Sequence, residues 1–362
     1  MNACVRDAAL ALAAFSTAVS LTACGLDAGD TSGGGSARTI GVLLPDSTTA
    51  RWEAWDRPLL EQKIRQLCGE CTVEHADAKG DVAVQQEQMD SSIAHGVDAI
   101  VLAAVDARAM SASVGRAAAA HIPVIAYDRL AEGPIAGYVS FDGQEVGRLQ
   151  GKALLTAMGA KAHGGRIVMM NGDPGDPNAL SFRQGALSEL EGKVTIAKQY
   201  DTPQWSTETA DLNMAAALSL LGADSIDGVY AANDGLAAGS IAALKADEVS
   251  PLPPVTGQDA ELAAVRRIVV GDQYMTVYKP FGPEAAAGGA MAVAAARGHR
   301  LDEVATRRVK TRNGAEVPAV LLTPVSVTLA TIKDTLVKDG VYTLGQICAP
   351  PLVRDCNRAG LT

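Results

Sequence analysis

The chain has 362 residues, of which 48% are hydrophobic and only 4% aromatic, and its formal net charge is −10 at pH 7. This length favours two domains, each able to bury its own core. The negative charge argues against nucleic acid as a partner, because binding to phosphates needs clustered Lys and Arg.

The first segment has the features of an export signal. An apolar run from Ala9 to Leu21 is shorter than the roughly 20 apolar residues that a membrane-spanning helix needs. It ends in Leu21-Thr22-Ala23-Cys24, which resembles the lipobox at which bacterial lipoproteins are processed. We therefore expect 1–23 to be a signal peptide and Cys24 to carry a lipid that anchors the exported protein to the cell membrane on its extracytoplasmic side. A short membrane anchor or a buried helix is the alternative. Residues 24–38 are Gly-rich and polar, and are expected to form a flexible tether.

Export affects how the cysteines are interpreted, because disulfides form in oxidising compartments. Cys68, Cys71, Cys348 and Cys356 remain in the mature chain, and four cysteines allow three pairings. We expect the local pairing, Cys68 with Cys71 and Cys348 with Cys356, since each pair is close in sequence and encloses a turn-like stretch. A redox or zinc site at the CxxC is the alternative, but the His residues are scattered without the spacing of metal ligands, so no metal is expected.

From Thr39 onward, short apolar runs alternate with longer segments whose apolar residues are spaced as in helices. Buried strands separated by helices indicate an α/β fold with parallel sheets built from βαβ units. About ten strands are predicted, which suits two sheets better than one. They are TIGVLLP (39–45), CTVEHADA (71–78), DAIVLAAVD (98–106), IPVIAYD (122–128), YVSFD (138–142), RIVMMNGD (166–173), KVTIAKQYD (193–201), GVYAAND (228–234), PVTGQD (254–259) and YMTVYKP (274–280).

Polar residues stand where these apolar runs end. Ligands of open parallel sheets bind outside the carboxyl ends of the strands, so these residues are expected to converge on one site. Asp and Asn also cap helices, and capping is the expected role of Asp106, Asp142 and Asp201. For Asp128-Arg129, Asn233-Asp234 and Lys279 capping is an incomplete account, since a cap needs neither Arg nor Lys.

Eight short segments occur in an order that is specific in combination. They are ARW (50–52), VIAYDRL (124–130), YVSFD (138–142), GDPGDPNALSFR (172–183), AAND (231–234), TGQDAEL (256–262), MTVYKP (275–280) and LLTP (321–324). Over residues 39 to about 345 the chain thereby resembles the type I periplasmic sugar-binding proteins, and most of all the D-xylose-binding proteins of ABC importers.

The resemblance implies two Rossmann-like α/β lobes with parallel sheets, joined by three crossover strands, with sugar held in the cleft between them as in a Venus flytrap. Lobe 1 would comprise 39–142 and 280–318, and lobe 2 would comprise 143–279 and 319–362. No cofactor is implied. Gly143 and Pro177 depart from the pattern of the relatives and leave the exact sugar open. Carried over by motif, the ligand-binding residues would be Arg51, Trp52, Asp128, Arg129, Asp176, Asn178, Trp205, Asn233, Asp259 and Lys279.

These residue types suit a sugar on physical grounds as well. A pyranose has an apolar face that packs on aromatic rings, which Trp52 and Trp205 could supply, and a rim of hydroxyls that bind carboxylates, amides and cations. For Trp55 we expect core packing instead. Asp128 and Arg129 are expected to bind sugar hydroxyls and, when the cleft is empty, to hold each other in register; a structural ion pair at a domain edge is the alternative.

Enzyme signatures are missing from the sequence. It contains no phosphate-binding loop, no G-x-S-x-G elbow and no dinucleotide fingerprint, and it lacks the N-terminal helix-turn-helix of repressors that share the fold. We interpret the chain as a lipid-anchored monomer that captures a monosaccharide, xylose or a similar aldose, and presents it to the transmembrane subunits of an ABC permease. A sugar-sensing subunit for a chemotaxis or histidine-kinase receptor is the alternative, and a glycosidase with two cleft carboxylates is a third.

Overall fold

The structure is a computed structural model, and it describes residues 37–361. The expected signal peptide, the expected lipidation site Cys24 and nearly all of the expected tether lie outside the described residues. Within the described part, no helix combines the length and apolar character needed to cross a bilayer.

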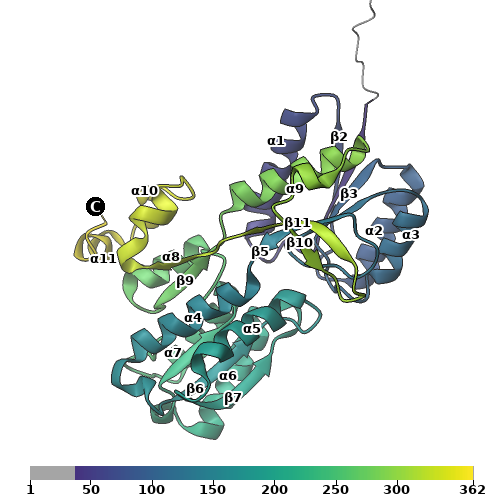
Figure 1. Cartoon of the computed structure of the whole chain (residues 1–362). Coiled ribbons are helices and arrows are strands. Elements are labelled where there is room, and N and C mark those ends of the chain that lie inside the picture. Colours follow the sequence, from purple (N-terminus) through teal and green to yellow (C-terminus); the bar gives the residue numbers. More distant parts are fainter. Residues whose placement is uncertain (1–36, 362) are drawn as a thin grey trace, which may run out of the picture. The chain divides into compact units, whose positions relative to one another are not determined.

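A mainly parallel sheet of seven strands, in the order β10-β11-β5-β4-β3-β1-β2, forms the centre of the first lobe (Figure 1). Helices cover both of its faces: α1 packs with α9 on one face and α2 with α3 on the other. Side chains of β1 alternate between the two cores, Val42 entering one and Leu43 the other, as the pleat of a strand requires. The elements are β1 (Thr39–Leu44), η1 (Trp52–Asp56), α1 (Arg57–Leu67), β2 (Thr72–Asp77), α2 (Val82–His95), β3 (Ala99–Leu102), α3 (Ser111–Ala119), β4 (Val124–Tyr127), β5 (Gly137–Phe141), α9 (Phe281–Ala296), η5 (Leu301–Glu303), β10 (Arg307–Lys310) and β11 (Glu316–Leu322).

The second lobe contains a parallel sheet in the order β7-β6-β8 and an antiparallel pair, β12-β9. Its core lies between the parallel sheet and the packed helix pairs α4 with α5 and α6 with α7. The elements are α4 (Gly143–Met158), η2 (Gly159–Ala162), β6 (Arg166–Asn171), α5 (Pro177–Leu190), β7 (Thr195–Asp201), η3 (Pro203–Trp205), α6 (Thr207–Leu221), η4 (Ala223–Ser225), β8 (Gly228–Ala231), α7 (Asp234–Ala246), α8 (Leu262–Val270), β9 (Met275–Tyr278), β12 (Val325–Thr328) and η6 (Leu329–Thr331).

The strand expected at 254–259 is only partly regular. It lies between β8 and β9, since the Val229 amide donates to the Pro254 carbonyl at 2.9 Å and the Val277 amide donates to the Gly257 carbonyl at 3.1 Å. A regular strand is interrupted at Asp259, whose φ of +94° is outside the β region. The segment thus joins the two small sheets of the second lobe without pairing along its whole length.

The chain passes between the two sheets three times. The first two passages follow β5 and β9, and the third follows β11, because β11 pairs with β5 whereas β12 pairs with β9. This pairing keeps the chain in the first sheet as far as Leu322, beyond the boundary at 318 expected from the sequence. We propose that the chain divides into two lobes at these three passages, as the strand pairing supports.

The C-terminal segment packs beside the second and third passages. It comprises η7 (Lys333–Val337), α10 (Leu344–Ile347) and α11 (Val353–Arg358), and its apolar side chains join those of α8, β9 and β12 in one core. Trp55 packs here as expected, stacked on Phe281 with ring centroids 5.8 Å apart and with the edge of Tyr342 against it. Disulfides join Cys348 to Cys356 in this segment and Cys68 to Cys71 at the end of α1, which is the pairing expected from the sequence.

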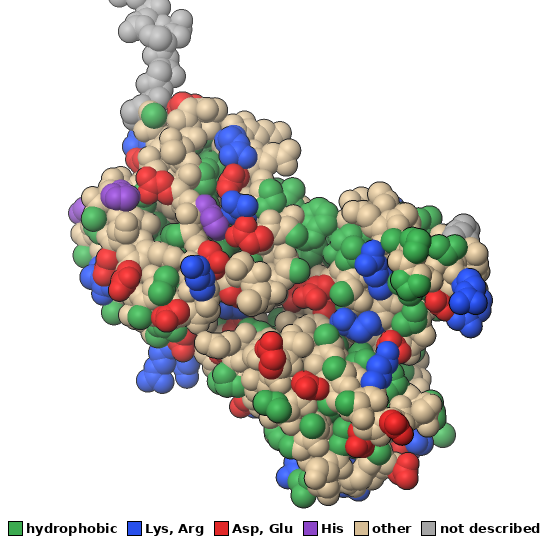
Figure 2. Space-filling view, turned by 180° about the vertical axis from the view of Figure 1, so that it is seen from behind, with side chains coloured by type: hydrophobic (Ala, Val, Ile, Leu, Met, Phe, Trp, Pro, Cys, Tyr) green, Lys and Arg blue, Asp and Glu red, His purple; other side chains and the backbone are tan. Residues whose placement is uncertain are grey.

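Charged side chains of both signs are interspersed over the surface that Figure 2 shows, on both lobes. That face carries no extended basic patch of the kind that nucleic-acid binding needs.

Candidate ligand-binding site

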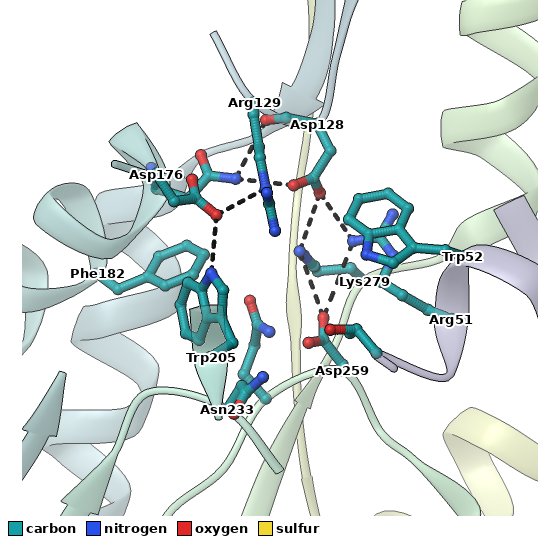
Figure 3. Close-up of a pocket in the computed structure, with 13 residues that line it drawn as sticks. Arg51, Trp52, Asp128, Arg129, Asp176, Phe182, Trp205, Asn233, Asp259 and Lys279 are labelled. Carbon is teal, nitrogen blue, oxygen red and sulfur yellow. Dashed lines mark hydrogen bonds and ion pairs between the residues drawn. The ribbon is translucent and has the colours of Figure 1, made fainter. Parts of the chain in front are cut away.

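A small pocket lies between the two lobes (Figure 3). All ten residues predicted to bind the ligand line this pocket, and all except Trp205 are buried. The site is therefore assembled from segments far apart in sequence, at the carboxyl ends of strands from both sheets. Three further residues line it that the sequence analysis did not select, namely Thr49, Phe182 and Gln258.

Asp128 is the centre of the charged network. It follows β4 with a φ of +57°, a conformation that turns its side chain out of the line of the strand. Its carboxylate accepts hydrogen bonds from Arg51 Nη1 at 2.8 Å, Lys279 Nζ at 3.0 Å and Asn178 Nδ2 at 2.8 Å. Three segments of the chain thus meet at one carboxylate.

Two buried acidic residues accept hydrogen bonds from the Arg51 guanidinium. Asp56 accepts from its Nε at 2.7 Å and from its Nη2 at 2.8 Å, and Glu284 accepts from Nη2 at 2.6 Å. Tyr127 donates its hydroxyl to Asp56 at 2.5 Å. A guanidinium has five N–H groups, so with Nη1 also bound to Asp128 only one is left for a ligand.

Arg129 connects the two lobes. Its Nε lies 2.7 Å from Asp176 Oδ2, and its Nη1 donates to the Ala104 carbonyl at 3.0 Å. The expectation that Asp128 and Arg129 hold each other was wrong: in the described part of the chain each side chain pairs with other residues instead. The positive φ of Asp128 directs the two side chains to different partners.

The two tryptophan rings of the pocket, Trp52 and Trp205, differ in how much of their surface can contact a ligand. Trp52 is buried, and the Arg51 guanidinium lies 4.5 Å from its ring centroid, so one face is already covered by a cation. Trp205 is half-buried, its Nε1 donates to Asp176 at 3.2 Å, and its ring is tilted against Phe182 at 6.5 Å. Phe182 and Trp205 together form an apolar wall on the side of the second lobe, as Figure 3 shows.

Gly172 makes room for that wall. A Cβ at this position would lie 2.0 Å from Cη2 of Trp205, which no real contact allows. The glycine that directly follows β6 therefore sets where the indole ring lies.

Asn233, Asp259 and Lys279 complete the pocket from the second lobe. Asn233 caps α7 through Oδ1, which accepts from the Leu236 amide at 2.9 Å, and this leaves its Nδ2 as a donor. Lys279 Nζ lies 3.4 Å from Asp259 Oδ1. Asp259 Oδ1 and Gln258 Oε1 are buried without a hydrogen-bond partner among the described residues, so the pocket offers acceptors as well as donors.

The pKa values of two acidic residues of the site are shifted in opposite directions. Burial alone would raise the pKa of Asp128, but the positive charges of Lys279, Arg51 and Arg129 outweigh burial and lower it. Burial raises the pKa of Asp176 to about 6, although Arg129 acts in the opposite direction. Cations and carboxylates alternate around the pocket, which leaves no surplus of positive charge for an anionic ligand.

Of the residues expected to act only as caps, Asp142 does so, since its carboxylate accepts from the Glu145 amide at 3.0 Å at the start of α4. Asp106 accepts from the Arg108 and Ala109 amides in the turn before α3. Asp201 is not a cap, because the chain turns through η3 before α6 begins; it lies 3.6 Å from Arg183 instead.

The chain matches the model of the periplasmic binding protein domain over residues 40–300, and it belongs to the type I periplasmic sugar-binding proteins. It is 35% identical over 311 residues to the D-xylose-binding periplasmic protein of Escherichia coli, an alignment that covers 84% of this chain and 90% of that protein. A multiple sugar-binding periplasmic receptor of Rhizobium radiobacter is 31% identical, with 85% and 92% covered.

Among solved structures, an ABC transporter solute-binding protein of Clostridium phytofermentans with bound β-D-glucose is similar with a TM-score of 0.79 and 29% identity. The similarity covers 86% of this chain and all of that one. These relatives are substrate-binding proteins, and the chain is accordingly a binding protein and not an enzyme.

Proposed function

We propose that the protein captures a neutral monosaccharide, with xylose favoured, in the pocket between its lobes and delivers it to an ABC permease. The observation that carries this proposal is the convergence of buried donors and acceptors with an aromatic wall in one pocket. Hydrogen bonds to charged groups contribute about 1.5–3 kcal/mol each. Three or four such bonds, less the losses of association, support a micromolar dissociation constant, or about −8 kcal/mol.

Closure would couple capture to delivery. The pocket is lined by both lobes, so a sugar contacts its full set of partners only when the lobes are together, and it favours that state by these extra contacts. Export and similarity to an ABC transporter solute-binding protein support the permease as the receiver of the closed form.

We propose further that lipid on Cys24 anchors the protein. Metabolic labelling with a radioactive fatty acid should mark the protein with Cys24 and leave Cys24→Ala unlabelled. Equal labelling of both would contradict this part of the proposal.

The capture proposal is tested by isothermal titration calorimetry of the full-length protein against a panel of pentoses and hexoses, with Trp fluorescence followed in parallel. One-to-one binding of xylose with a change in fluorescence is expected, because Trp205 lines the pocket. No binding across the panel would contradict capture of a monosaccharide.

A further inference from the structure

Asp234 is a buried acidic residue that the pocket itself does not use. It follows Asn233 at the start of α7, it is 0% exposed, and it does not line the pocket. Capping does not explain it, because Asn233 is the residue whose side chain caps α7. A buried carboxylate is costly unless its hydrogen bonds are satisfied, so the partners of Asp234 indicate its role.

The Asp234 carboxylate accepts hydrogen bonds from three donors. Its Oδ1 accepts from Gln273 Nε2 at 2.8 Å. Its Oδ2 accepts from the Thr276 hydroxyl and from the Glu261 amide, each at 2.9 Å. The Asp234 amide in turn donates to the Gln258 carbonyl at 2.9 Å. One residue is thus bonded to both ends of the stretch from Gln258 to Glu261, here called the 258–261 segment.

The 258–261 segment brings pocket residues to the site in a strained backbone conformation. Gln258 and Asp259 line the pocket. Asp259 has a φ of +94° and Ala260 a φ of +51°, a region that residues with a Cβ rarely adopt. Such conformations persist only where the surrounding structure holds them. The bonds that Asp234 makes on either side of these two residues supply that restraint.

Strand β9 supports the same segment through a side chain that Asp234 orients. The Asp259 amide donates to the Val277 carbonyl at 2.9 Å, and the Ala260 amide donates to the Thr276 hydroxyl oxygen at 3.1 Å. A hydroxyl has one proton, and that of Thr276 is donated to Asp234. The carboxylate therefore fixes the hydroxyl group that holds Ala260.

Gly257 permits this close contact. A Cβ at this position would lie 2.0 Å from Asp234 Oδ1 and 2.3 Å from Gln273 Nε2, which no real contact allows. Gly257 comes directly before Gln258, so the carboxylate lies against the backbone that leads into the 258–261 segment. Only glycine at this position leaves room for the Asp234 carboxylate.

We propose that Asp234 is a positioning residue, which holds the 258–261 segment so that Asp259 presents its carboxylate to the ligand. Asp259 Oδ1 is buried without a hydrogen-bond partner among the described residues, and it lies 3.4 Å from Lys279 Nζ (Figure 3). Groups that bind a ligand must be held within about 0.5 Å of the productive geometry. This inference rests on the proposed function, since the ligand in question is the sugar in the pocket.

The first test is Asp234→Asn, measured by isothermal titration calorimetry of the full-length protein with the sugar that the wild type binds most tightly, expected to be xylose. Asn has the shape of Asp but replaces one acceptor oxygen with an NH2 group. In either orientation this group would face a donor, Gln273 Nε2 or the Glu261 amide. The 258–261 segment should shift, and the affinity for the sugar should fall about tenfold.

Leu244→Ala is the control for a general loss of stability. Leu244 is a 0% exposed core residue of the same helix and does not line the pocket. Its truncation leaves a cavity and destabilises the fold. The affinity for the sugar should nevertheless stay within about twofold of the wild type. An equal loss of affinity in Leu244→Ala and Asp234→Asn would overturn the inference, because destabilisation alone would then explain it.

The Thr276 hydroxyl allows a second test that leaves Asp234 in place. Thr276→Val keeps the shape but neither donates to Asp234 nor accepts from Ala260, so it should also weaken binding about tenfold. Thr276→Ser keeps the hydroxyl and should stay within about threefold of the wild type. If Asp234→Asn does not fold, as circular dichroism would show, this pair of variants decides. Equal binding by the two would contradict the inference.

A double-mutant cycle asks whether Asp234 acts through Asp259. Asp259→Gly removes the carboxylate at a backbone conformation that glycine adopts freely. Adding Asp234→Asn to Asp259→Gly should then change the affinity less than about threefold. Two independent losses that multiply would refute the positioning role. Where Asp259→Gly no longer binds measurably, Asp259→Asn takes its place, because Asn keeps an acceptor oxygen and tolerates a positive φ.

The outcomes separate the inference from the proposed function. If the wild type binds a sugar and Asp234→Asn folds and binds it equally well, the inference fails and the proposed function stands. If the wild type binds no sugar of the panel, the proposed function fails and the inference fails with it.

Discussion

Asp128 shows how one side chain can organise a site. Its carboxylate receives hydrogen bonds from Arg51, Lys279 and Asn178, which come from three separate segments. The residue is buried, so its charge is tolerated only because cations surround it. The lowered pKa of Asp128 expresses the same balance, since these cations favour the ionised form more strongly than burial opposes it.

Asp128→Asn should therefore destabilise the fold. Removing this charge leaves Arg51 and Lys279 buried with one anion fewer, which is expected to lower the free energy of unfolding by about 3 kcal/mol. Urea denaturation followed by circular dichroism measures the change. Asp142→Asn is the control, because the Asp142 side chain is 48% exposed and Asn caps helices equally well. Equal stability of the two variants would contradict the role given to Asp128.

Asp176 gives a prediction about pH. Burial raises its folded-state pKa to about 6, above the value of about 3.9 expected in the unfolded chain. The folded protein therefore holds an extra proton between these values. The resulting contribution to stability is present below about pH 4 and is lost as the pH rises through 6.

The comparison with Asp176→Asn isolates this group from others whose pKa burial also raises, such as Glu261 and Glu284. Between pH 4 and 7 the wild type should lose up to about 3 kcal/mol of unfolding free energy relative to the variant. Urea denaturation at pH 4, 5, 6 and 7 measures the difference. A difference that stays constant with pH would show that Asp176 has an ordinary pKa in the folded protein.

At the scale of elements, the carboxyl ends of the parallel strands place the site. The sequence allowed β1, β3 to β6, β8 and β9 to be predicted as buried runs, because strands covered by helices on both faces are nearly uniformly apolar. The polar residues after β4, β8 and β9 could be selected for the same reason, since each interrupts such a run. They now lie together in one pocket.

Other elements carried no such signal. The four residues of β10 include three cations, so from the sequence they look like a surface loop. They form a strand only because they pair with β11. Phe182 lies within helix α5, where an aromatic residue is usually a core residue. Gln258 and Thr49 stand beside other polar residues in irregular segments, so nothing in the sequence singles them out. Their places in the pocket follow from packing between lobes, which no local pattern encodes.

Gly172→Ala should displace the apolar wall formed by Trp205 of η3 and Phe182 of α5. The new Cβ would overlap the Trp205 ring, which lies on a half-buried segment and can move away. We expect sugar affinity to fall about tenfold or more, since stacking contacts contribute about 1 kcal/mol beyond burial. Titration calorimetry and near-UV circular dichroism measure the effect. Gly69→Ala, where a Cβ meets nothing within 4 Å, is the control. Unchanged affinity in Gly172→Ala would show that Trp205 does not contact the sugar.

At the scale of the whole molecule, the two disulfides constrain the chain to different degrees. Cys348–Cys356 spans a separation of 8 residues and Cys68–Cys71 a separation of 3. In the chain-entropy model the longer loop gives the larger stabilisation, by about 0.7 kcal/mol. The double variant Cys348→Ser/Cys356→Ser should therefore unfold at a lower temperature than Cys68→Ser/Cys71→Ser. Differential scanning calorimetry under oxidising conditions measures both, and the reverse order would contradict this prediction.

The late position of β11 in the chain has a consequence for how the molecule is made. β11 lies beside β5 in the first sheet, yet all of residues 143–279 are synthesised between them. The core of the second lobe between α4 and α7 comes from one continuous stretch, so it can be completed while the first sheet still lacks two strands. Until residue 322 has emerged, the outer edge of β5 remains unpaired and open to wrong partners. A nascent chain that stays unfolded until all of it has been exported would avoid wrong pairing at this edge. This protection matters more here than for a protein whose domains follow each other in sequence.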